Sequence, residues 1–141
     1  MGKINLKGVL LGGLVAGIVL NAWDFLMYGV LMRAEFDAAM QAIGKTIPDS
    51  AMWLWVVLDL LWGVWFVWLY AMIRPRYGPG PRTALIAGLF LWVGLGVLHA
   101  VGESPMGIFS TGMWVKAVGS ALVAWPLAAI AGARFYTEPT A

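Results

Sequence analysis

Several ionisable side chains stand inside long apolar stretches of the chain, where charged groups are rare. They are Asp24, Asp59, His99, Glu103 and Lys116. An Asp or Lys that faces lipid costs about 2.5–3.5 kcal/mol on the insertion scale, and pairing with another group is the usual remedy. Any chemistry of this chain is therefore expected to start from these five residues.

The simplest use of Lys116 is a structural ion pair with Asp59 or Asp24, completed by Asn21 and the N–H groups of nearby Trp side chains. Such a pair leaves a surplus of negative charge, because two Asp and one Glu stand against one Lys. The surplus predicts that one carboxyl group is protonated, or that a cation, a polar ligand or water occupies the site.

Metal binding is a second use of these residues. His99 and Glu103 stand four residues apart, and with Asp24 and Asp59 they would offer ligands suited to Zn, Mn or Fe. A single His in the chain argues against a strong zinc site. A lone His also suits haem or chlorophyll, but nothing else supports a cofactor. A hydrogen bond from His99 to Glu103 or to a loop is the simpler interpretation, so we assign no metal ligands and leave the cofactor unknown.

The elements that carry these residues are long apolar helices. The sequence is 62% hydrophobic and only 11% charged, which is outside the range of soluble domains. About 20 apolar residues in a helix cross a bilayer core of roughly 30 Å, and four stretches qualify: residues 8–32, 52–73, 83–102 and 111–133. We expect an all-α fold, a four-helix transmembrane bundle that forms one domain over residues 1–141.

The connection between the first two spans carries its own helical pattern. Phe36, Met40 and Ile43 recur at helical spacing among polar residues. This pattern predicts a short amphipathic helix on the outer surface, between transmembrane helices 1 and 2.

The basic residues predict the orientation. Six of them fall on one side of the expected bundle and two on the other; the six are Lys3, Lys7, Arg74, Arg76, Arg82 and Arg134, and the two are Arg33 and Lys45. The positive-inside rule places both termini in the cytoplasm. Charges at helix ends also argue against a nucleic-acid partner, and the absence of Cys excludes disulfides and thiolate chemistry.

The polar residues of the spans share one level. At 1.5 Å per residue, Asp24 lies about 12 Å, Asp59 about 10 Å and Lys116 about 8 Å below the outer end of its helix. Their helical faces also carry small residues or Trp, which favours an inward orientation. We therefore predict one outward-facing polar pocket that binds a ligand; its residues are Asn21, Asp24, Tyr28, Trp55, Asp59, Trp62, His99, Glu103 and Lys116.

Small residues and proline indicate how the helices pack. Gly8/Gly12 and Gly13/Gly17 have GxxxG spacing, for which internal packing is expected ahead of self-association. Pro126 should kink the last helix. Residues 14–20 resemble residues 85–91, so the chain is also a candidate for two related hairpins.

Three functions remain open. The first is a non-catalytic membrane protein whose pocket stabilises the bundle and binds a small ligand or cation. The second is an accessory or structural subunit of a larger membrane complex, which deep Trp side chains on an outer face would favour. The third is a proton-coupled transporter or membrane enzyme. Polar groups are missing from the inner half and no nucleophile is visible, so an enzyme is uncertain and less expected. The expected partners are the lipid bilayer and a homo-oligomer or larger complex.

Three stretches carry a resemblance to other proteins. They are GLVAGIVLNAWDF at 13–25, IRPRYGPGP at 73–81 and PMGIF at 105–109. They resemble an uncharacterised family of small four-span bacterial membrane proteins, a domain of unknown function. The resemblance implies four spans and a bacterial inner membrane, and it supplies no catalytic residues.

Overall fold

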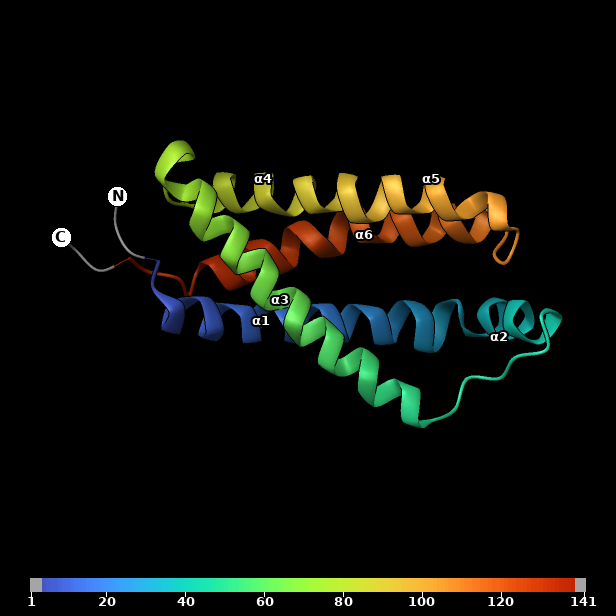
Figure 1. Ribbon diagram of the computed structural model, residues 1–141. Helices are drawn as coiled ribbons and strands as arrows, with labels where there is room; N and C mark the ends of the chain where they lie inside the picture. Colours follow the sequence, from blue (N-terminus) through green and yellow to red (C-terminus); the bar gives the residue numbers. More distant parts are fainter. Residues whose placement is uncertain (1–3, 139–141) are drawn as a thin grey trace.

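The computed structural model describes residues 4–138, and those residues form helices and turns without a β-strand (Figure 1). The elements are α1 (Leu6–Asp24), the π-helical segment η1 (Phe25–Leu31), α2 (Arg33–Ala42), α3 (Ser50–Tyr77), α4 (Pro81–Leu91), the π-helical segment η2 (Trp92–Leu98), α5 (His99–Glu103), the 3₁₀ turn η3 (Ser104–Met106) and α6 (Thr111–Ala133). The all-α class and the short helix between the first two spans are confirmed.

Four continuous helical rods are long and apolar enough to cross a membrane. They run over Leu6–Leu31, Ser50–Tyr77, Pro81–Met106 and Thr111–Ala133. The third rod begins two residues before the sequence predicted, because a proline at the first helical position lacks only an N–H that would have no intrahelical partner. At the start of the fourth rod, the Ser110 hydroxyl accepts the Met113 N–H at 3.2 Å and caps the helix.

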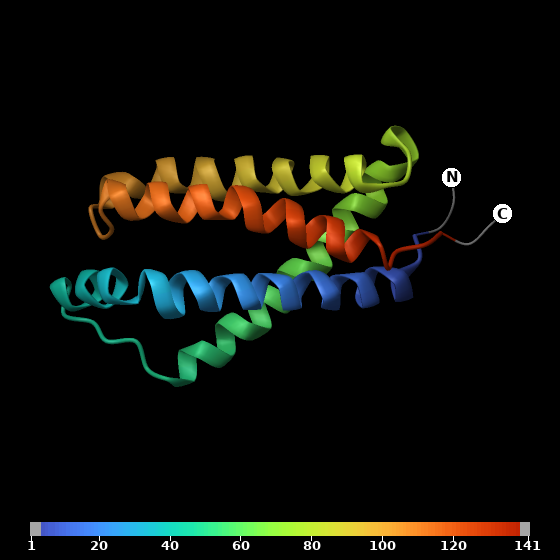
Figure 2. The same ribbon diagram turned by 180° about the vertical axis from the view of Figure 1, so that it is seen from behind.

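Both described chain ends lie at one end of the bundle, beside the turn between α3 and α4 (Figures 1 and 2). We call this the terminal end. The opposite end carries α2 and the loop between η3 and α6, and we call it the α2 end. The basic turn and the termini are thus on the same side of the bundle, as the sequence predicted.

Glycines set the closest approach of the helices. A Cβ atom on Gly63 of α3 would lie 2.7 Å from the Gly17 Cα of α1, and one on Gly13 would lie 2.6 Å from the Val64 Cα. Gly12 and Gly132 make a similar contact between α1 and α6. The predicted internal use of the GxxxG spacings is confirmed, because only glycine leaves room for backbones this close.

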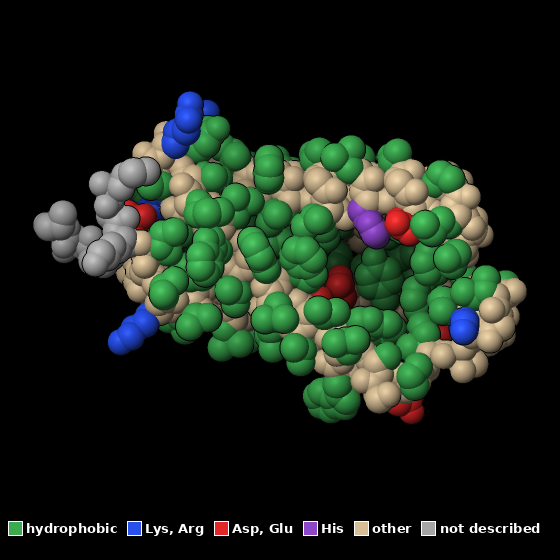
Figure 3. All heavy atoms as spheres, viewed as in Figure 1, with side chains coloured by type: hydrophobic (Ala, Val, Ile, Leu, Met, Phe, Trp, Pro, Cys, Tyr) green, Lys and Arg blue, Asp and Glu red, His purple; other side chains and the backbone are tan. Residues whose placement is uncertain are grey.

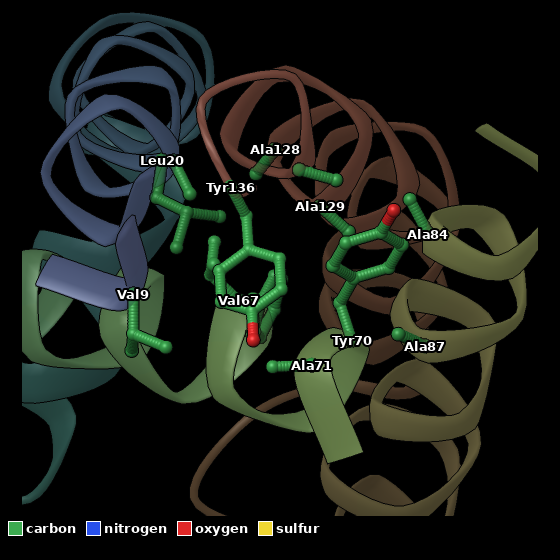
Figure 4. Packing of buried hydrophobic residues seen from close by; sticks show 13 residues of the cluster. Val9, Leu20, Val67, Tyr70, Ala71, Ala84, Ala87, Ala128, Ala129 and Tyr136 are labelled. Carbon is green, nitrogen blue, oxygen red and sulfur yellow. The ribbon is translucent and has the colours of Figure 1, made fainter. Parts of the chain in front are cut away.

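The best-packed core lies toward the terminal end, where small residues let all four rods meet (Figure 4). Its largest fully buried side chain is Phe66, and alanines fill much of the remainder. Toward the α2 end the pair α1–α3 diverges from the pair α4–α6, as both ribbon views show. The divergence leaves a hollow on the side of the molecule, with an acidic side chain in it (Figure 3).

Candidate functional site

A cavity of about 110 Å³ lies between α1, α3 and α6. Its walls are Leu20, Asp24, Asp59, Trp62, Phe66 and Trp125. A water molecule needs roughly 10–15 Å³ of such space, so the cavity has room for several waters or a small organic group. It is therefore a site in which two carboxyl groups from different helices are surrounded mainly by aromatic and aliphatic walls.

The α1–α3 crossing positions the two carboxyl groups. A Cβ atom on Gly17 would lie 3.0 Å from the Asp59 carbonyl oxygen, so the Asp59 backbone packs directly on α1. Asp24 lies about two turns beyond Gly17 toward the α2 end. The two Asp side chains are close enough to interact electrostatically, and Tyr28 lies within the same range of both. Within residues 4–138 neither Asp forms an ion pair.

Asn21 stabilises the crossing of α1 and α3 and does not line the cavity. Its Nδ2 donates to the Gly17 carbonyl oxygen at 3.0 Å and to the Val56 carbonyl oxygen of α3 at 3.2 Å. Trp92 makes a comparable bond in the other hairpin, where Nε1 donates to the Val118 carbonyl oxygen of α6 at 2.8 Å. Each bond ties together the two helices of one hairpin.

The predicted pairing of Lys116 with Asp59 or Asp24 is wrong. Lys116 Nζ instead forms an ion pair with Glu35 of α2, and both side chains are about half exposed. A long Lys stem can carry its ammonium group toward the end of a helix, where the charge is better solvated than in the core. Because Lys116 pairs with Glu35, it does not neutralise either Asp side chain as the sequence predicted.

Trp55 and His99 lie outside the cavity, in an aromatic cluster at the α2 end. Phe36 of α2 stacks on Phe109, with ring centroids 5.5 Å apart, and lies 6.4 Å from Trp55. Trp114 continues the cluster with centroid distances of 5.7 Å to Phe109 and 6.1 Å to His99. Through Phe36, the cluster packs α2 against α3 and against the loop that precedes α6.

The expected hydrogen bond from His99 to Glu103 or to a loop is also wrong for the part of the chain that the structure describes. His99 is exposed and packs edge-on against the Trp114 ring. Glu103 does not line the cavity, and residues 4–138 contain no group of three or more His, Asp or Glu side chains that could hold a metal ion.

Of the nine predicted pocket residues, the structure places Asp24, Asp59 and Trp62 on the cavity wall. Tyr28 lies nearby and bridges to Phe36, with a centroid distance of 6.5 Å. The sequence could have indicated Phe66, which shares a helical face with Asp59 and Trp62 at spacings of three and four residues. Nothing in the sequence indicated Trp125, because its place depends on how α6 crosses α1 and α3.

No protein-family model matches the chain, and no curated protein or solved structure matches it either. The resemblance to small four-span bacterial proteins therefore stays a prediction.

Proposed function

We propose that this chain is an integral membrane protein that binds a small organic ammonium cation in the cavity lined by Asp24 and Asp59. We further propose that it resides in a bacterial inner membrane with the terminal end in the cytoplasm, as the distribution of Lys and Arg indicates. The observation that carries the binding proposal is the pair of acidic side chains in one cavity without a basic side chain on its wall.

Charge balance supports a cationic ligand. Uncompensated carboxylates inside a membrane span are costly, and their usual partners are basic side chains. Lys116 pairs with Glu35 of α2, and Lys116 does not line the cavity. A bound ammonium group would balance one Asp carboxylate in place of the missing basic side chain, and a proton on the other carboxyl group would leave the cavity without net charge.

The walls favour an organic ammonium group over a metal ion. Trp62, Phe66 and Trp125 present aromatic rings to the cavity, and aromatic faces attract ammonium groups by cation–π interactions. Ca²⁺ takes six to eight oxygen ligands, whereas this cavity offers two carboxyl groups among apolar walls. The hollow also opens on the side of the bundle (Figure 3), so the apolar part of a ligand could remain in lipid.

Binding is measured on the full-length chain in detergent, with Trp fluorescence as the signal because Trp62 and Trp125 line the cavity. The probe is n-butylammonium, and n-butanol is its neutral counterpart. We expect saturable binding of the ammonium and none of the alcohol. Asp24→Asn and Asp59→Asn should each weaken binding about tenfold, since each removes one charge close to the cation.

Asp37→Asn is the matched control, because Asp37 is an exposed carboxylate of α2 and does not line the cavity. It should leave the affinity unchanged. Equal affinity for butanol and butylammonium, or full affinity in both cavity variants, would refute the proposal.

A second function is favoured by one observation. Trp65 lies near the middle of α3 and is 60% exposed, so in a membrane its side chain borders the hydrocarbon region, and its indole N–H has no acceptor among the described residues. A partner protein that accepts this N–H would make the chain an accessory subunit of a larger complex. Purification from native membranes should then recover a stoichiometric partner that Trp65→Phe, which keeps the ring and removes the N–H, releases. Recovery of the chain alone would count against this function.

A further inference from the structure

A second cavity lies at the terminal end, far along the bundle from Asp24 and Asp59. It has a volume of about 190 Å³ and is lined by Tyr70, Gly80, Pro81, Ile130, Ala133 and Arg134. We propose that this cavity binds the phosphate of an anionic phospholipid headgroup. The two cavities share no lining residue, so this inference does not depend on the proposed cation site.

The Tyr70 hydroxyl provides the first sign of a ligand. Tyr70 is only 2% exposed, and its hydroxyl oxygen accepts the Gly80 N–H at 3.1 Å. Within the described part of the chain no acceptor receives the hydroxyl proton. Figure 4 shows the hydroxyl directed between α4 and α6, where the cavity lies. A phosphate oxygen there would accept that proton, so that the hydroxyl both donates and accepts a hydrogen bond.

One basic side chain and a helix N-terminus border the same cavity. Arg134 borders it, and α4 starts beside it with Pro81 at the first helical position. The N–H groups of Arg82 and Thr83 belong to the first turn, so they have no acceptor inside the helix. No side chain of residues 4–138 caps them, because the N-cap residue of α4 is Gly80; the Thr83 hydroxyl donates instead to the Gly78 carbonyl oxygen at 2.7 Å. A helix N-terminus together with an Arg guanidinium is well suited to phosphate.

The remaining walls indicate a lipid rather than free phosphate. Ile130 and Ala133 line the cavity with apolar surface, which suits the glycerol and acyl carbons next to a headgroup. The cavity also lies where the spans α3, α4 and α6 end, at the expected level of headgroups. Basic pockets between helices on the cytoplasmic side are known to bind anionic lipids.

Native mass spectrometry of the full chain in detergent tests the inference, with phosphatidylglycerol and phosphatidylcholine of identical acyl chains as probes. We expect phosphatidylglycerol to bind about tenfold more tightly. Arg134→Gln should remove most of this preference, and Tyr70→Phe should weaken it severalfold. Arg76→Gln is the matched control, because Arg76 is an exposed Arg at the same end that does not line the cavity; it should change the preference less than twofold.

Three outcomes would overturn the inference. Equal loss in Arg134→Gln and Arg76→Gln would mean diffuse attraction by all basic residues of the terminal end. Displacement of the lipid by millimolar inorganic phosphate would mean a site for a free anion. Equal binding of the two lipids would mean that the cavity does not select an anionic headgroup over a zwitterionic one. If Arg134→Gln does not fold, Arg134→Lys replaces it. This variant keeps the charge but loses the bidentate geometry of the guanidinium. An unchanged preference for phosphatidylglycerol in Arg134→Lys would contradict the role assigned to the guanidinium.

Discussion

Replacing Gly63 by Ala should separate the two helices that carry Asp24 and Asp59. The added Cβ would lie 2.7 Å from the Gly17 Cα, and its other close neighbours are also backbone atoms of Gly13 and Gly17. Carbon atoms in ordinary contact lie about 3.5–4.0 Å apart, so α1 and α3 must move apart by roughly 1 Å. Backbone atoms cannot rotate away as a flexible side chain would.

The expected loss of unfolding free energy is about 3 kcal/mol, the upper end of the usual cost of overpacking. Unfolding in mixed micelles with increasing SDS, followed by circular dichroism, measures it. Because the movement displaces Asp24 from Asp59, the affinity for n-butylammonium should fall together with the stability.

Gly119→Ala is the matched control, since a Cβ on Gly119 of α6 meets no atom within 4 Å. It should be neutral or stabilise the protein by up to about 1 kcal/mol, the difference in helix propensity between the two residues. A Gly63→Ala protein as stable as Gly119→Ala would refute the close crossing, and with it the account of how the two Asp side chains are brought together.

Three further predictions concern individual interactions. A double-mutant cycle with Lys116→Met and Glu35→Gln should give a coupling of about 0.2–1 kcal/mol, because both side chains are half exposed; a coupling of several kcal/mol would mean a buried pair. Trp92→Phe should lower the unfolding free energy by about 1 kcal/mol through the lost bond to the α6 backbone. Trp23→Phe is its control, as the buried Trp23 N–H has no partner among the described residues, and equal losses in the two variants would contradict the bond. Burial, with a smaller contribution from Glu138, raises the pKa of Tyr136 above its ordinary value of 10.0. The folded protein then holds this proton more tightly than the unfolded chain, so the unfolding midpoint should fall as the pH rises beyond about 10, and Tyr136→Phe should fall less over the same range.

The architecture of this chain follows from its sequence because the bilayer leaves few choices. Stretches of about 20 apolar residues must form helices whose backbone groups bond internally, so four rods could be predicted without knowing their neighbours. Turn residues such as Pro81 and Ser110 then fixed where the rods begin, to within a few residues. The placement of both termini beside the Arg-rich turn follows from the even number of rods.

The glycine spacing on α1 predicted a close contact with another helix, because a face of small residues lets two helix backbones approach each other. It did not say which helix packs against it. That the partner is Gly63 of α3 depends on two surfaces fitting together, and no local pattern in either segment encodes that fit.

The composition of the polar site was decided only by tertiary structure. Depth along a helix placed Asp24, Asp59 and Lys116 at a common level, but depth does not fix the direction in which a side chain points. The crossing of α1 and α3 kept the two Asp residues together in a cavity. The separation of α6 from α1 toward the α2 end left Lys116 near α2, where Glu35, from a segment outside the spans, is its partner. Ion pairs depend on distances of a few ångströms between side chains of separate helices, and these distances arise only when the helices pack.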